Sequence, residues 1–443
     1  MASLADKMAS NMNFGAFSKA KDLQHRLLFT LLALIIFRLG TYVPFPGINP
    51  NVLHDFFSSN SGGLLGMFNA FTGGALSRMS ILALNIMPYI SASIIVQLAA
   101  SVVPSLMALK KEGESGMRKI NQYTRYLTVL ITVVQAFFMA QALLAANAVI
   151  MSSHGMFVLT TVVSLLGGTM FVVWLGEQIT SRGVGNGASL LIMIGIVSGI
   201  PGAIARVFEE SRTGAISFWV VIALLAMAFA LIYIIVMFER AQRRIVVHYP
   251  KRQMGNRMMQ GANSHLPLKI NPTGVMPPIF ASALLAVPVA IVQFSSKNST
   301  SNFVNELAVL LTPGHWLYIG LFAFLIIFFT FFYTGIQSNP KETADNLKKQ
   351  GGFVAGIRPG HNTAEYLDYV ITRLTVLGAA YLTILCILPE FLIASFHIPF
   401  VLGGTTLLIV VSVIMDTASQ IQSHLIAHQY EGLIKKAKLK GRF

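Results

Sequence analysis

Long apolar runs, separated by short polar stretches, dominate the sequence between Leu27 and Met415. A helix of about 20 apolar residues can cross the hydrocarbon core of a bilayer. In lipid the backbone must satisfy its own hydrogen bonds, and a helix does so. The pattern therefore predicts an all-α polytopic membrane protein. Its ten spans are expected at residues 27–43, 76–100, 124–146, 156–176, 188–205, 216–238, 273–293, 316–337, 372–392 and 399–416.

The composition supports this class, since 54% of the residues are hydrophobic and only 11% are charged. The apolar runs leave no long stretch in which a separate soluble domain could fold. The single cysteine, Cys386, lies inside an apolar run, so neither an intramolecular disulfide nor a zinc cluster is expected. The first run lacks an A-x-A cleavage pattern and is expected to be a retained signal anchor.

The positive charges fall almost entirely on one side of the predicted spans. Of the 32 Lys and Arg residues, 27 lie in the terminal segments, in the loops or at the span ends on that side. The positive-inside rule places this side in the cytoplasm. Both termini are therefore expected to be cytoplasmic.

The predicted spans divide into two halves of five. The expected organisation is a cytoplasmic segment 1–26, a first half 27–207, a linker 208–215, a second half 216–416 and a cytoplasmic tail 417–443. The second half carries two basic loops, 239–272 and 338–371, with too few apolar residues for a core of their own. These loops could bind anionic lipid, nucleic acid or a protein, or they could merely set the topology.

The second span of each half is interrupted by glycine or proline. Gly62–Ser77 is apolar but too short to span, and Gly73-Gly74 separates it from the next run, while residues 274–294 contain three prolines. Matching interrupted segments in two inverted halves point to a conduction or binding site. Gly62–Ser77 is therefore interpreted as a re-entrant half-helix. An amphipathic helix on the outer surface is the alternative.

Few charges are available to line a path between these segments. The nearby acidic residues lie at span ends, so a proton- or sodium-coupling chain is not expected. The candidate lining is instead aliphatic, and an apolar constriction can close a pore by dewetting. It consists of Ile86, Leu190 to Ile192, Ile279 and Ile409. Ordinary helix packing is the alternative for each of these residues.

Six longer strings suggest a family. They are NIMPYISASIIVQL (85–98), KKEGESGMRKINQYTRY (110–126), WLGEQITSRGVGNGASL (174–190), ERAQRRIVVHYPKRQ (239–253), NPKETADNLKKQGGFVAGIRPG (339–360) and GGTTLLIVVSVIMD (403–416). Together they resemble the SecY/Sec61-alpha family of protein-conducting channels over about 26–443. The resemblance implies a clamshell of two pseudo-symmetric, inverted five-helix halves in the bacterial inner membrane. It also implies a passive channel with no catalytic residues, metal or cofactor.

By this resemblance, a ring of aliphatic side chains closes the waist of the pore: Leu82, Ile86, Ala188, Ile192, Ile279 and Ile409. Ala188 is small, so it either leaves a gap or is compensated by Leu191. A plug helix is implied within 62–74, with Gly73-Gly74 as its hinge. The plug residues are Gly62, Leu64, Leu65, Met67, Phe68, Phe71, Thr72, Gly73 and Gly74.

The resemblance also implies a lateral gate between the second and third spans and the seventh and eighth. Its residues are Asn85, Pro88, Ser91, Gln97, Pro277, Pro278 and Ser282. Helix-breaking prolines and small residues would let this seam open. Preprotein signal sequences could then pass sideways into membrane lipids. Asn85 and Gln97 either hydrogen-bond across the closed gate, face solvent or bond to the backbone.

The basic loops resemble docking surfaces of the family. The implied partners are a SecA-like motor ATPase, the ribosome, and SecE-like and SecG-like small membrane subunits. The ribosome would be contacted partly through the phosphates of its RNA. The docking residues are Arg243, Arg244, Lys251, Arg252, Arg257, Arg358, Pro359 and Gly360.

Two other function classes are alternatives to a passive channel. A secondary solute transporter with inverted repeats would need coupling-ion ligands near mid-membrane, where almost none occur. A membrane enzyme or self-powered motor is disfavoured because the sequence has neither a Walker A motif nor HExxH. Gly183–Gly187 resembles a nucleotide-binding loop only superficially, since it follows a membrane helix, and a tight interhelical turn is expected.

Overall fold

The structure is a computed structural model that describes residues 21–49, 52, 69, 72–145, 149–150, 153–214, 217–249, 252–254, 257–259, 263–285, 310, 315–396 and 403–440. The chain divides into two compact units, Met1–Arg206 with Ile409–Phe443, and Val207–Leu408. Eight helices in the described ranges are long and apolar enough to cross a membrane, or nine if the bent pair α6–α7 is one span. The predicted class, an all-α polytopic membrane protein, is confirmed.

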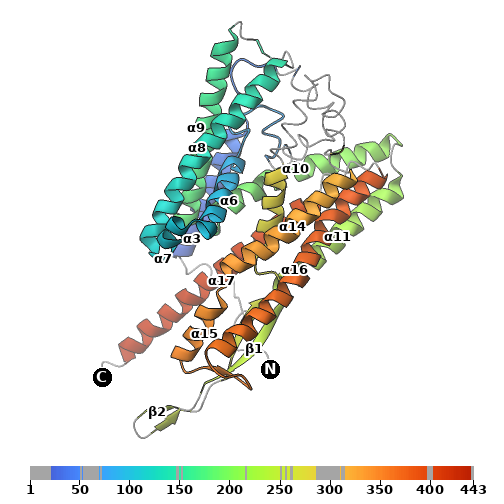
Figure 1. The fold of residues 1–443 in the computed structure, drawn as a ribbon. Helices are drawn as coiled ribbons and strands as arrows, with labels where there is room; N and C mark the ends of the chain where they lie inside the picture. Colours follow the sequence, from blue (N-terminus) through green and yellow to red (C-terminus); the bar gives the residue numbers. More distant parts are fainter. Residues whose placement is uncertain are drawn as a thin grey trace. The chain divides into compact units, whose positions relative to one another are not determined.

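The first unit is built from helices that pack side by side along the chain. They are α3 (Lys21–Gly40), α6 (Met87–Val102), α7 (Pro104–Lys111), α8 (Glu114–Ala145), α9 (His154–Arg182), most of α10 (Gly187–Arg212) and the later part of α17 (Gly404–Lys440). Helix α9 packs on α3 and on α8, and α6 packs on α8 (Figure 1). In the core of this unit, Phe45 meets Phe157 edge to face, with ring centroids 6.0 Å apart.

The prediction of a helix over 76–100 is wrong in its first half, because α6 begins only at Met87. Residues 72–86 form consecutive turns and are called the turn segment below. Their backbone bonds instead to the stretch after α3: Phe45 N donates to Met79 O at 2.9 Å, and Ile81 N donates to Val43 O at 3.1 Å. This tertiary pairing overrides the helical preference of an apolar run.

A sharp bend separates α6 from α7. The two helices meet at 96° across Val103, and Pro104 begins α7. Proline is tolerated there because the first turn of a helix has no intrahelical partner for its N–H groups. Helix α7 contains no buried residue and carries Lys110 and Lys111 in its last turn.

The second unit combines membrane helices with a small sheet. Its helices are α11 (Phe218–Arg240), Met276–Leu285, α14 (Trp316–Gln337), α15 (Pro340–Lys349) and α16 (His361–Phe396), followed by the start of α17. Strands β1 (Gln242–His248), β4 (Asn263–Lys269) and β5 (Phe353–Val354) form an antiparallel sheet in the order β4-β1-β5. Strands β2 (Arg252–Met254) and β3 (Arg257–Met259) pair separately. Helix α16 packs on α14 and α15 (Figure 1).

The expectation that the two basic loops lack a core is wrong. Together with the first turns of α16 they bury one apolar cluster, here called the docking core: Ile245, Ala344, Val354, Ala364, Leu367, Val370 and Leu374. Leu367 is 1% exposed. Each loop supplies only part of this cluster, so neither loop taken alone contains enough apolar residues to reveal it.

Several predicted boundaries shift. Helix α14 has the bounds expected for the eighth span, whereas α16 begins at His361, well before the predicted 372. Helix α10 continues to Arg212 and contains Pro201, so most of the predicted linker 208–215 is helical. The described part of the seventh span ends at Leu285. From Ile409 onward, α17 belongs to the first unit and not to the predicted second half.

Candidate functional site

Five of the six predicted ring residues belong to the first unit. Leu82 and Ile86 come from the turn segment, Ala188 and Ile192 from the start of α10, and Ile409 from α17. All except the half-buried Ala188 are at most 5% exposed. The local sequence thus places aliphatic side chains in the interior from three separate stretches of the chain.

Gly176 in α9 marks the place where two of these stretches meet. A Cβ atom there would lie 3.6 Å from both Ile86 Cδ1 and Ala188 N, and 3.4 Å from Leu191 Cδ1. Leu191 is fully buried. A large aliphatic side chain therefore lies beside the small Ala188, which supports the alternative in which Leu191 compensates for it.

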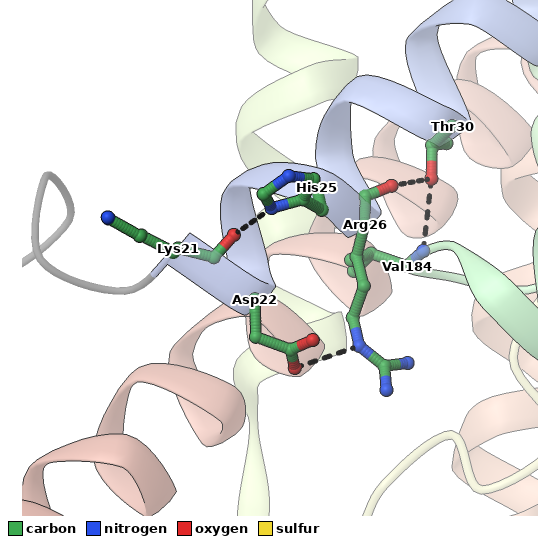
Figure 2. Close-up of polar contacts among 6 residues, drawn as sticks. All are labelled: Lys21, Asp22, His25, Arg26, Thr30 and Val184. Atoms are coloured by element: carbon green, nitrogen blue, oxygen red, sulfur yellow. Dashed lines mark hydrogen bonds and ion pairs between the residues drawn. The ribbon is translucent and has the colours of Figure 1, made fainter.

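The turn between α9 and α10 positions Ala188 and Ile192. Figure 2 shows Thr30 Oγ1, which donates to Arg26 O at 2.9 Å and accepts from Val184 N at 3.0 Å. Gly185 N donates to Gln420 Oε1 in α17 at 2.9 Å, and Gly187 N donates to Thr180 Oγ1 at 2.9 Å. The prediction of a tight interhelical turn at Gly183–Gly187 is confirmed, and hydrogen bonds tie this turn to both α3 and α17.

Two ion pairs join residues of the first-unit helices. In α3, Asp22 accepts from Arg26 Nε at 3.2 Å, an exposed pair that contributes little to stability (Figure 2). Between α8 and α9, Arg125 bonds Glu177 at two points, with Nε–Oε1 at 2.9 Å and Nη2–Oε2 at 2.6 Å. In the described part of the chain, no three His, Cys, Asp or Glu residues gather to hold a metal ion.

The sixth ring residue, Ile279, lies in the second unit and is 7% exposed. It belongs to the helix Met276–Leu285, in which Pro277 and Pro278 occupy the first turn and Ser282 Oγ donates to Ile279 O at 2.9 Å. Pro88 likewise lies in the first turn of α6. Both helices thus begin next to their prolines, at a position where a first turn accommodates proline, and the role of these prolines in opening a seam stays a prediction.

The polar gate candidates Asn85 and Gln97 lie in different local environments. Gln97 Nε2 donates to Ser93 Oγ at 3.1 Å, a bond inside α6 that none of the alternatives anticipated. Asn85 is buried and has a positive φ of 50°. Ser91 is half-buried on α6.

Most of the predicted plug, 62–68 with 70 and 71, lies outside the described residues. Thr72, Gly73 and Gly74 are described. Gly73 and Gly74 have φ values of 64° and 79°, which glycine adopts without the steric cost that other residues meet. These positive φ values therefore explain why both positions are glycine.

Some of the docking candidates are sequence neighbours of docking-core residues, on β1 and just before α16. Arg243 and Arg244 are exposed on β1, and Arg358 and Pro359 are exposed just before α16. Gly360 is buried, with a φ of 109°, and its carbonyl accepts from Ala364 N at 3.1 Å at the start of α16. Arg252 and Arg257 lie on the paired strands β2 and β3, and Lys251 falls outside the described residues.

Comparisons with known proteins agree with this architecture. The SecY family model matches residues 80–418. The chain is 51% identical to the protein translocase subunit SecY of Vibrio cholerae over 430 residues, covering 96% of this chain and 97% of the relative. It is 50% identical to the SecY of Escherichia coli K12 over 423 residues, covering 95% and 96%.

Solved structures share the fold. The structure described as "The structure of a protein conducting channel" matches with a TM-score of 0.65 and 17% identity, covering 91% of this chain and 92% of that one. Sec61 in the canine ribosome-channel complex matches with a TM-score of 0.61 and 16% identity, with the same coverages. With half of all positions identical to curated relatives over nearly the full length, the chain belongs to the SecY family.

Proposed function

We propose that the six ring positions form the seal of a channel for unfolded polypeptides, and that hydrophobic segments leave this channel sideways into lipid. Family membership makes the chain the pore-forming subunit of a protein translocase, a multi-pass protein of the inner membrane. The observation that carries the position of the seal is the meeting of Ile86, Ala188 and Leu191 around Gly176.

An aliphatic seal suits a substrate of any sequence. Such side chains offer no fixed hydrogen bonds to a passing chain, and they repack around it through van der Waals contacts. A polar ring would bind some sequences and conduct ions.

The driving force comes from outside the chain, from a SecA-like ATPase or a ribosome. SecE-like and SecG-like subunits complete the complex, and both termini face the cytoplasm.

A stalled translocating chain will crosslink to photoreactive probes at Ile86, Ile192, Ile279 and Ile409. The reason is that a chain in the seal touches every ring position. Probes at Phe229 and Tyr233 in α11, each 71% exposed on an apolar helix, serve as controls and will stay silent. The measurement is the yield of crosslinked substrate at each position. Equal yields at ring and control positions would contradict a central seal.

Docking is proposed for the exposed arginines around the docking core. Arg358 is held at the start of α16, where Thr363 Oγ1 donates to its carbonyl at 3.0 Å. The Sec61 neighbour was solved in a ribosome-channel complex, which supports a ribosome-binding role for the corresponding face. A fixed backbone and an exposed guanidinium suit contacts to carboxylates or to RNA phosphates.

Arg358→Glu will lower motor-dependent secretion by roughly tenfold, because it places like charges against an acidic partner. The measurement is the rate of preprotein import into vesicles containing the complete complex. Arg118→Glu is the matched control, since Arg118 is also an exposed cationic residue and forms only a local pair with Glu114 at 2.8 Å. Normal import by the Arg358 variant, with intact assembly, would refute the docking role.

A further inference from the structure

Two arginines converge on the first turn of the turn segment. Arg38, in the last turn of α3, donates from Nη1 to Gly73 O at 3.1 Å. Arg78 donates from Nη2 to the same oxygen at 2.8 Å and from Nε to Gly74 O at 3.0 Å. Hydrogen bonds from a charged donor are stronger than those between neutral groups. Arg78 is local to the turn, whereas Arg38 ties the turn to a separate helix.

Tyr42 holds the two guanidinium groups together. Its hydroxyl accepts from Arg38 Nη2 at 3.1 Å, and its ring lies 4.9 Å from Arg38 Cζ and 4.2 Å from Arg78 Cζ. Tyr42 lies beyond the end of α3, and the hydrogen bond from Arg78 and the charge of Arg38 lower the pKa of its phenol. Among the described residues neither arginine forms an ion pair with a carboxylate, so the backbone carbonyls are their main partners.

Other residues also contact the first turn of the turn segment. A Cβ atom at Gly73 would lie 2.6 Å from Gly195 O and 2.4 Å from Ser198 Oγ, so this residue fits closely against α10. Asn69 O accepts from Gly74 N at 2.9 Å, and Asn69 Oδ1 accepts from Ser77 N at 2.9 Å. The start of the turn segment is thus fixed against two helices at once.

The end of α3 contacts the same segment a second time, at a ring residue. A Cβ atom at Gly40 would lie 2.7 Å from Leu82 Cδ1, so Leu82 packs directly on the helix turn that carries Arg38. Leu82 and Ile86 follow Gly73 along one stretch of consecutive turns, whose backbone bonds are mostly of the i to i+3 type and do not form a continuous helix. Its position depends on anchors from outside, and Arg38 is one of them.

We propose that Arg38 and Arg78 are positioning residues for the seal: by holding the Gly73 carbonyl they fix the turn segment, and with it Leu82 and Ile86, so that the resting channel does not leak ions. This inference rests on the proposed ring. The contacts that fix the two guanidinium groups go to the Gly73 and Gly74 carbonyls and to Tyr42, so the proposed action on the ring runs through the backbone that they hold. Loosening them changes the tightness of the resting seal more than the capacity for transport.

The test uses the complete complex in vesicles, with Arg38→Gln and Arg78→Gln as separate variants. Each variant loses charge-assisted bonds to Gly73 O. The expected result is a resting ion leak raised on the order of tenfold, with import of a normal preprotein kept within about twofold. Arg38→Lys, which keeps one charged donor, will give an intermediate leak. Arg212→Gln removes an exposed arginine at the end of α10 and will leave the leak unchanged.

The outcomes separate the two proposals. A leak as low as in the unaltered protein, in both glutamine variants, would overturn the positioning role. If one variant fails to assemble, the other and Arg38→Lys still decide the question. If the proposed ring is wrong, the crosslinking experiment will show it, because a stalled chain will then not crosslink to Ile86 and Ile192. A parallel fall in leak-tightness, import and yield of complex would also count against the proposal, since it indicates general misfolding.

Discussion

Gly187→Ala will prevent stable assembly of the first unit. A Cβ atom at this position would lie 1.9 Å from the carbonyl oxygen of Gly176 and 2.7 Å from its carbonyl carbon. Both are backbone atoms of α9, so no side chain can rotate away, and the two helices must separate. Overpacking usually costs about 1–3 kcal/mol, and a clash with backbone is expected at or above the top of that range. The start of α10 would move, carrying Ala188 and Ile192 away from Ile86.

The measurement is the amount of folded complex extracted from membranes and its Tm. Gly199→Ala is the matched control, because Gly199 lies in the same helix and a Cβ atom there meets nothing within 4 Å. It will behave like the unaltered protein or be slightly more stable, since alanine favours a helix. Equal yields and melting temperatures for the two variants would show that the close crossing at Gly176 is not required.

Leu367→Ala will unfold the docking core while leaving the membrane helices in place. Leu367 is 1% exposed and packs among residues from both basic loops. Removing a buried leucine side chain costs about 2–5 kcal/mol, a large share of the stability of such a small cluster. Strands β1 and β4 will lose their protection from hydrogen exchange, and motor-dependent import will fall because the arginines proposed for docking lose their fixed positions.

Leu377→Ala provides the comparison, since Leu377 lies in the same helix and is 57% exposed. Its effect on exchange in β1 will be negligible. Unchanged exchange in β1 for the Leu367 variant would mean that the strands are stable without this cluster, and that the sheet β4-β1-β5 does not depend on α16.

The membrane helices were predictable because one physical rule governs them. Apolar length alone places a helix in lipid, so the run from Trp316 to Gln337 was predicted to the residue. Burial of the ring positions followed from a resemblance, since periodicity cannot distinguish Ile86 from other core isoleucines. The seam expected between the gate helices stays a prediction, as does the plug.

The wrong predictions have a common cause, which is contact between residues that lie far apart in the sequence. Residues 76–86 are apolar enough for a helix, but the stretch around Val43 and Phe45 takes their backbone hydrogen bonds. The docking core needs apolar residues from stretches about 100 residues apart, which no local window combines. Arg38 lies within the predicted first span, and its sequence neighbours do not indicate Gly73, 35 residues away, as its partner.

The length of α16 has a mechanical consequence. Its 36 residues form one continuous helix, about 54 Å long at the usual rise per residue. The first turns are embedded in the docking core, and the rest is apolar enough to lie in the bilayer. A load on the sheet β4-β1-β5 would therefore act on one end of a long lever, and a small tilt of the first turns of α16 would become a displacement of the helix as far as Pro389, the proline in its interior.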